Sequence, residues 1–166
     1  VLCGIEQDLY SRQSVEGYDY VIGSLHYVKA GDTYISVDHK PEILIDAVER
    51  YFGGDIYGLM ECYYGTLAEL AGKAEISVIG HFDLVAKFNE KYALFDENHP
   101  RYVTAWQAAA QRLLKKKIPF EINTGAISRG LRIEPYPAKP IWAYIRERGG
   151  KFILSSDSHS PDNLCF

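Results

Sequence analysis

The segment 151–161, KFILSSDSHSP, constrains the fold of this chain more than any other stretch. It begins with a short apolar run that is too short for a helix and suits a strand buried on both faces. Polar residues follow immediately, among them Asp157 and His159. Because residues two apart in an extended chain point the same way, these two side chains could face one site. Taken alone, the segment fits a Ser-rich turn with an Asp cap equally well.

The same pattern, an apolar stretch that ends in a side chain able to bind metal, occurs at three earlier places. The stretches are VLCGIEQD, YDYVIGSLHYV and ISVIGHFDL, and they carry Glu6, His26 and His81, the last with Asp83 two residues on. Buried strands that deliver polar groups from their carboxyl ends are typical of the active-site face of an α/β barrel. The remaining histidines, His39 and His99, fall outside the pattern.

Strand and helix signals alternate along the chain. The predicted strands are 1–6, 20–27, 76–80, 119–123 and 151–155, and the predicted helices are 41–52, 56–71, 101–116 and 140–148. Pro41 marks one helix start and Gly53-Gly54 the end of that helix. The fold class is therefore α/β with about five parallel strands, whose carboxyl ends share one face. Residues 1–166 are expected to form a single domain.

Composition excludes several classes of partner. The formal net charge of -4 gives no electrostatic reason to expect nucleic acid or an anionic membrane as a partner. No apolar run approaches 18 residues, so no membrane span is expected. The three cysteines, Cys3, Cys62 and Cys165, are an odd number without paired spacing, which predicts reduced thiols and a cytoplasmic location.

Convergence of Glu6, His26, His81, Asp157 and His159 at the mouth of a barrel needs a physical reason. Buried charge is costly, so these groups should be neutralised by one another or by cations. Mixed imidazole and carboxylate ligands suit zinc, iron or manganese, and the lack of cysteine at the strand ends argues against a thiolate site. Individually, each histidine is more often structural and Glu6 could be a helix cap or a surface charge. The joint pattern favours a metal site.

The motifs GIEQD, IGSLHY, VIGHFDL, FEINTGA and SSDSHSP, in this order, resemble those of the PHP (polymerase and histidinol phosphatase) superfamily. Within it the chain is most similar to the histidinol-phosphate phosphatase branch, and the resemblance covers essentially the whole chain. It implies part of a distorted (β/α)7 barrel whose complete site holds up to three divalent metal ions.

The resemblance also implies roles for single residues. Glu6 is expected to bridge two metals, His26 and His81 to ligate the second, Asp157 the first and His159 the third. Asp83 matches no ligand and is expected to orient a histidine. The family's His-x-His motif on the first strand is not present, so the domain is expected to be incomplete at its N-terminus and clipped at its C-terminus.

The activity that the resemblance implies is metal-dependent hydrolysis of a small phosphate monoester. L-histidinol phosphate, converted to L-histidinol and phosphate in histidine biosynthesis, is the expected substrate. The expected catalytic residues are Glu6, Asp157 and Arg129. The Arg129 guanidinium matches phosphate oxygens bidentately, although a surface arginine explains it equally well. Lys87 and, more weakly, Arg132 are further candidates for a phosphate contact.

Three alternatives remain open at this point. Another PHP phosphoesterase, with a different small phosphate or a nucleotide as substrate, would share all the ligands. A non-catalytic PHP module would serve structure or bind a partner protein, and an ordinary α/β binding domain would hold no metal. The segment 84–100 is long enough to be a binding loop or a lid. The oligomeric state is not predicted.

Overall fold

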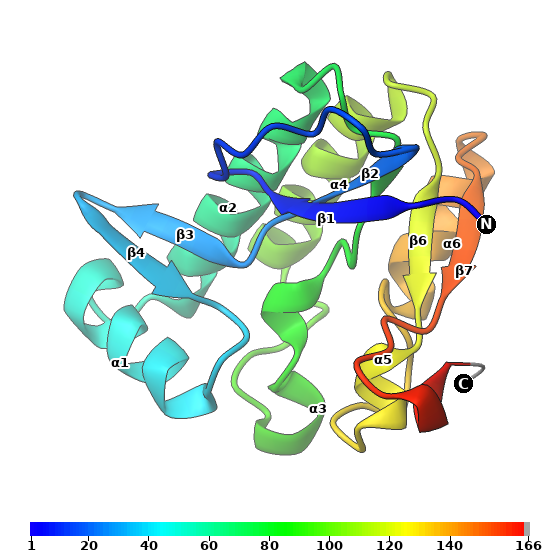
Figure 1. Ribbon diagram of the computed structural model, residues 1–166. Helices are drawn as coiled ribbons and strands as arrows, with labels where there is room; N and C mark the ends of the chain where they lie inside the picture. Colours follow the sequence, from blue (N-terminus) through cyan, green and yellow to red (C-terminus); the bar gives the residue numbers. More distant parts are fainter. Residues whose placement is uncertain (165–166) are drawn as a thin grey trace.

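A computed structural model describes residues 1–164, which form a five-stranded parallel sheet and a two-stranded antiparallel hairpin (Figure 1). In spatial order the sheet contains β1 (Gly4–Asp8), β2 (Tyr20–Ser24), β5 (Val78–Ile79), β6 (Phe120–Asn123) and β7 (Phe152–Ser155). Every neighbouring pair in it is parallel, so the carboxyl ends of all five strands lie along one edge. The prediction of five parallel strands alternating with helices is confirmed.

The helices lie between the strands in sequence. They are α1 (Pro41–Phe52), α2 (Ile56–Leu67), α3 (Asn89–Tyr92), α4 (Pro100–Leu114), α5 (Gly125–Ser128) and α6 (Lys139–Glu147), with 3-10 turns at Ala68–Gly72, Leu84–Ala86 and Pro161–Asn163. The bounds predicted for α1 are confirmed, because Pro41 stands in its first turn and Gly53 ends it in the left-handed region, at φ 61°.

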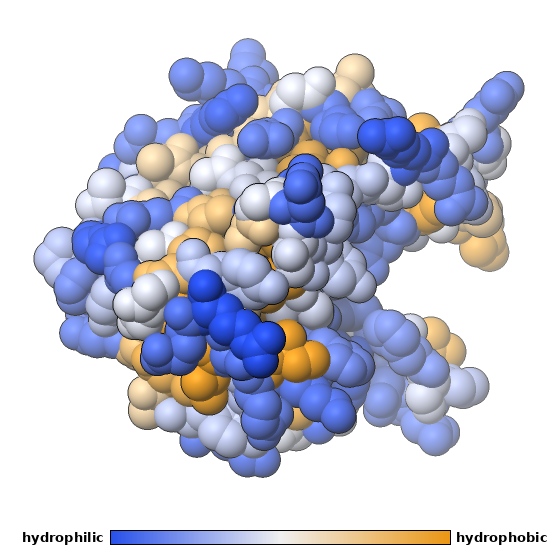
Figure 2. Space-filling view, turned by 90° about the vertical axis from the view of Figure 1, so that its left-hand side faces the viewer, coloured by the Kyte–Doolittle hydropathy of each residue, from blue (hydrophilic) through white to orange (hydrophobic). Residues whose placement is uncertain are grey.

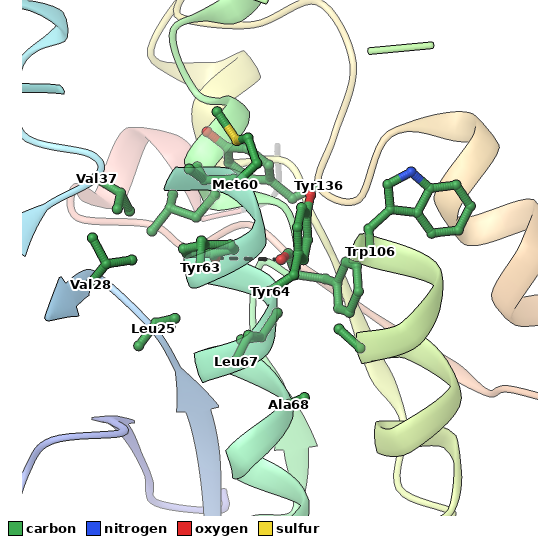
Figure 3. Packing of buried hydrophobic residues seen from close by; sticks show 14 of the residues in the cluster. Leu25, Val28, Val37, Met60, Tyr63, Tyr64, Leu67, Ala68, Trp106 and Tyr136 are labelled. Carbon is green, nitrogen blue, oxygen red and sulfur yellow. Dashed lines mark hydrogen bonds between the residues drawn. The ribbon is translucent and has the colours of Figure 1, made fainter. Parts of the chain in front are cut away.

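The core lies between the sheet and helices α2 and α4, which stand behind the sheet in Figure 1. Tyr63, Tyr64 and Leu67 on α2 are fully buried and lie between Leu25, which follows β2, and Trp106 of α4 (Figure 3). The hydroxyl of Tyr64 donates to that of Tyr102, 3.1 Å away, so this buried polar atom has a partner. The α2–α4 layer thus supports the strands from one side.

The second strand was predicted to span 20–27, and the predicted C-terminal end of this strand is wrong. β2 ends at Ser24, and the chain enters a hairpin of β3 (Tyr27–Ala30) and β4 (Thr33–Ser36) that the sequence reading did not predict. The backbone N–H of His26 donates to Asp8 Oδ2 at 2.8 Å, so a contact from distant sequence interrupts the strand. The hairpin had a local signal, because Gly31-Asp32 is a two-residue turn between residues of high strand propensity.

The segment 84–100, predicted as a binding loop or lid, is packed against the core in its first part. Leu84, Val85 and Ala86 are buried in a 3-10 turn, and Phe88 is 7% exposed. Lys87 lies between these buried residues and is partly exposed. Tight packing on both sides of Lys87 fixes where its side chain leaves the core.

The surface is mixed in character. Strand β7 lies at one edge of the sheet and exposes Leu154 to 81%. The side of the molecule with the hairpin and α1 is mostly hydrophilic, with apolar patches among the polar residues (Figure 2). None of the described helices is long and apolar enough to cross a bilayer. Cys3 and Cys62 are free thiols, and Cys165 lies outside the described residues.

Replacing Leu67 by Ala should lower the free energy of unfolding by about 2–5 kcal/mol, because the cavity left in the α2–α4 layer cannot collapse fully. The matched control is Ile45→Ala on α1, where the side chain is 46% exposed and the change should stay within about 0.5 kcal/mol. Urea titration followed by circular dichroism measures both. Equal midpoints for the two variants would contradict this account of the core.

Candidate metal centre

Glu6, His26 and His81 meet at the carboxyl ends of three neighbouring strands. Glu6 lies on β1, His26 follows β2 by two residues, and His81 follows β5 by two. His81 Nε2 lies 2.9 Å and His26 Nε2 3.5 Å from Glu6 Oε1. One ligand atom from each of the three lies within 4.8 Å of the others, a spacing that could hold a metal ion. The sequence prediction that these three converge is confirmed.

Electrostatics hold Glu6 in its charged form. Burial alone would raise the pKa of Glu6, but hydrogen bonds from His81 and Ser24 and the charges of His81 and His26 lower it to about 2. For His81 the effects have the opposite sign. Burial would lower the pKa of His81, but its hydrogen bond to Glu6 and the nearby carboxylates raise this pKa. At neutral pH the site therefore presents a carboxylate, which is the form that ligates a cation.

The donor set fits a divalent cation. Two imidazoles and one carboxylate suit zinc, iron and manganese. His81 is only 4% exposed, and its Nδ1 is buried with no hydrogen-bond partner in the described part of the chain. A buried nitrogen of this kind costs free energy until a ligand or proton partner satisfies it. Because His81 faces Glu6 through Nε2, the case for a cation rests on the two Nε2 atoms and the Glu6 carboxylate, and not on Nδ1.

Ser24 fixes the Glu6 carboxylate from the neighbouring strand. Its hydroxyl donates to Glu6 Oε1 at 2.6 Å and is fully buried. A Cβ at Gly80 would approach Ser24 Oγ to 2.5 Å, so only glycine leaves room for this hydroxyl. Position 80 therefore determines the geometry of Glu6 indirectly.

Asp8, which the sequence reading missed, orients His26. Its Oδ2 accepts from the backbone N–H of His26 and lies 3.2 Å from His26 Nδ1, while Oδ1 accepts from the backbone of Tyr10. With Nδ1–H directed at Asp8, the Nε2 lone pair faces Glu6. Burial would raise the pKa of Asp8, but these hydrogen bonds lower it. The available signal was the Glu-x-Asp spacing on β1, which places both carboxylates on one face.

Glu121 was also missed and positions the His81 backbone. Its Oε2 accepts from the backbone N–H of His81 at 2.9 Å and from Asn123 Nδ2 at 3.0 Å. Glu121 and Asn123 are 3% and 1% exposed, so β6 supplies a buried polar support beneath the site. A buried carboxylate within the apolar strand FEIN was the signal that could have found it.

The expected role of Asp83 in orienting a histidine is wrong. Asp83 Oδ2 accepts from the backbone N–H of Ala138 and lies 3.7 Å from Arg132 Nη1. Burial raises the pKa of Asp83 against the opposing charge of Arg132. Arg132 is itself 5% exposed and donates to Glu90, so its suggested contact with phosphate is wrong as well. Arg132 instead lines a separate cavity of about 870 Å³ between α4 and α6.

Asp157, His159 and Arg129 form a second group beside the triad. Arg129 Nη2 lies 3.3 Å from Asp157 Oδ2, and Arg129 Nη1 lies 3.3 Å from His159 Nδ1. Asp157 has φ 45°, in the left-handed region, and a Cβ at Gly125 would come within 2.8 Å of its Cβ. Glycine at 125 therefore leaves the room that Asp157 occupies. The metal-ligand roles of Asp157 and His159 remain predictions.

A cavity of about 410 Å³ unites the two groups. Besides Asp38, Leu84 and Tyr136, the cavity is lined by the five predicted metal ligands and two of the predicted phosphate contacts. These are Glu6, His26, His81, Asp157 and His159, with Lys87 and Arg129. Carboxylates, imidazoles and two cationic side chains thus surround one space. Its size suits a phosphate group and part of an attached alcohol.

Two curated proteins resemble the chain over most of its length. The chain is 32% identical over 154 residues to a protein named probable histidinol-phosphatase from Deinococcus radiodurans, covering 90% of this chain and 50% of that protein. A protein of the same name from Clostridium acetobutylicum is 24% identical over 151 residues, covering 89% and 52%. Over most of its length the chain is thus similar to proteins named probable histidinol-phosphatase. It spans about half the length of these curated relatives.

A solved structure shares the fold of this chain. The crystal structure of hisK from Listeria monocytogenes, a protein named as a histidinol phosphatase, superposes with a TM-score of 0.72 at 20% identity. The match covers 89% of this chain and 56% of that chain. At this identity the likeness supports the α/β fold alone. No family model matches the chain.

His81→Ala should lower the metal content by about one ion per chain, because it removes one ligand of the triad. His39→Ala, which changes an exposed histidine outside the triad, should leave the metal content unchanged. Elemental analysis of the purified protein measures both. A full complement of metal in His81→Ala would refute the triad as a metal site.

Asp8→Ala should behave differently, because it removes the partner of His26 and no ligand. We expect metal affinity to fall roughly 10- to 100-fold, with the number of ions bound at saturating metal unchanged. Asp32→Ala in the exposed hairpin turn is the control and should keep the affinity of the unaltered protein. Metal titration against a competing chelator distinguishes affinity from stoichiometry, and an unchanged affinity in Asp8→Ala would contradict its role.

Proposed function

We propose that this chain forms part of the active site of a metal-dependent phosphatase that hydrolyses a small phosphate monoester, with L-histidinol phosphate as the substrate. The observation that carries the proposal is the 410 Å³ cavity, in which the Glu6–His26–His81 triad and two cationic side chains face one space. The names of the relatives support the same activity.

The triad would hold a divalent ion of zinc, iron or manganese. When bound, such an ion supplies Lewis-acid stabilisation of charge on phosphate oxygens and lowers the pKa of a coordinated water. Because the pKa of Glu6 is about 2, this residue serves as a ligand and not as a proton donor at neutral pH. Asp8, Glu121 and Ser24 keep the ligands in place through the contacts described above.

Lys87 and Arg129 would bind the phosphate oxygens. Lys87 Nζ donates to the carbonyl of Asp38 at 2.7 Å, which leaves further N–H groups for an anion. Arg129 is held by Asp157 and by the carbonyl of that residue, so its planar guanidinium is oriented before substrate arrives. Asp157 would thus act in catalysis by positioning Arg129, and its expected role as a metal ligand is part of the same proposal.

The decisive experiment is an assay of phosphate release by the metal-loaded protein. L-histidinol phosphate should be hydrolysed with a higher kcat/KM than other small phosphate esters and nucleotides, and removal of metal with a chelator should abolish the reaction. Hydrolysis of another ester in its place would favour a PHP phosphoesterase of different specificity. Metal binding without hydrolysis of any ester would favour the non-catalytic module.

Arg129→Ala should raise KM for the phosphate ester and lower kcat/KM by roughly 10- to 100-fold, the effect of losing a charge-assisted hydrogen bond. Its metal content should stay unchanged, because Arg129 is not a ligand. Arg112→Ala on the exposed side of α4 is the control and should retain normal kinetics. Steady-state kinetics with parallel elemental analysis tests this, and normal kinetics in Arg129→Ala would discard the role.

A further inference from the structure

A second cavity, of about 710 Å³, adjoins the proposed active site. It is lined by His26, Tyr27, Ser36, Asp38, His39 and Lys87. Three of these, His26, Asp38 and Lys87, also line the cavity that contains the triad and Arg129. Because the two cavities share these walls, a molecule whose phosphate lies at the triad has this second space available for its remaining atoms.

The second cavity is built from the β3–β4 hairpin and the loop that follows it. Tyr27 and Ser36 are paired across the hairpin, and the backbone N–H of Val37 donates to the carbonyl of His26 at 3.0 Å. Val28 and Val37 are fully buried, and they lie in the core beside α2 (Figure 3). The wall is therefore held in place by the core and presents its polar groups in fixed positions.

Two side chains of opposite charge, Lys87 and Asp38, line the second cavity. Lys87 lies between the cavities and is bound to the Asp38 backbone carbonyl, while its Nζ is 3.7 Å from Asp38 Oδ2. Asp38 Oδ1 accepts from the Ser36 hydroxyl at 3.0 Å, and the Asp38 side chain is 26% exposed. A carboxylate offers about four acceptor positions, so Asp38 can accept further hydrogen bonds from a ligand.

The remaining walls suit a flat or apolar group. Tyr27 is 42% exposed, and His39 is exposed beside it. Aromatic rings of this kind offer a face on which a ring or a short alkyl chain can pack. The cavity therefore combines one negatively charged acceptor with aromatic surface.

We propose that the groove formed by Tyr27, Ser36, Asp38 and His39 binds the alcohol part of the phosphate ester, and that Asp38 selects alcohols that carry an ammonium group. This inference rests on the proposed phosphatase function and assigns its specificity to the hairpin. Ser36 is a positioning residue, since its hydroxyl fixes the orientation of the Asp38 carboxylate. Lys87 and Asp38 line both cavities, and the proposal assigns the Lys87 ammonium to the phosphate and the Asp38 carboxylate to the alcohol.

The test compares two esters that differ in one group, 2-aminoethyl phosphate and 2-hydroxyethyl phosphate. The metal-loaded protein should show a kcat/KM at least tenfold higher for the amino ester. In Asp38→Asn this ratio should fall by at least tenfold. Use of the ratio cancels any effect that loss of the Asp38–Lys87 contact has on both esters. Asp32→Asn in the hairpin turn removes the same charge at an exposed position and should keep the ratio.

A ratio near one in the unaltered protein, or an unchanged ratio in Asp38→Asn, overturns the proposal. Ser36→Ala should reduce the ratio by a smaller factor than Asp38→Asn, and a larger reduction would contradict the positioning role.

A binding measurement separates this inference from the proposed activity. 2-Aminoethylphosphonate and its hydroxyl counterpart cannot be hydrolysed, and calorimetry in the presence of manganese measures their affinities. If no ester is hydrolysed, the proposed phosphatase function fails. Preferential loss of aminoethylphosphonate affinity in Asp38→Asn would then still support the subsite, while equal loss for both phosphonates would overturn it.

Discussion

The arrangement depends on one contact, the approach of His81 Nε2 to Glu6 Oε1 across the carboxyl end of β2. Glu6 lies on β1 and His81 follows β5, and β2 separates these two strands, so the contact requires the strands to be parallel and in register. Glu6 is paired opposite Ile22, and β2 places Ser24 where its hydroxyl reaches the same oxygen. Groups from three neighbouring strands therefore meet at the Glu6 carboxylate, and a cation bound there would neutralise its negative charge.

Two layers of polar residues surround this contact. Asp8 and Glu121 do not line the 410 Å³ cavity, yet each fixes the ring or the backbone of a histidine. Arg129 and Asp157 provide a second preoriented group on the other side of the cavity. Preorganisation of this kind matters for catalysis because side chains that are already in place need not reorder when charge develops. The strands and these buried hydrogen-bond partners thus explain how the side chains that line the cavity keep a fixed geometry.

The sequence predicted the site residues better than their supports. Glu6, His26 and His81 could be found because each follows an apolar stretch, and the parallel topology brings such positions together. Asp8 and Glu121 were missed because they act through contacts with residues far away in the sequence. Arg132 and Asp83 were misjudged for the same reason, since their pairing with one another and with Ala138 depends on the packing of α6. The predicted end of the second strand at residue 27 was wrong, because the backbone N–H of His26 donates to Asp8 and the strand stops at Ser24.

Gly80 illustrates how far the site reaches into the sheet. It has no side chain that could bind a metal, but its bare backbone leaves the space that the Ser24 hydroxyl occupies. A side chain at position 80 would push the Ser24 hydroxyl away from the Glu6 carboxylate, so the geometry of the site depends on a residue that has no side chain of its own. Any redesign of this cavity should therefore keep glycine at position 80.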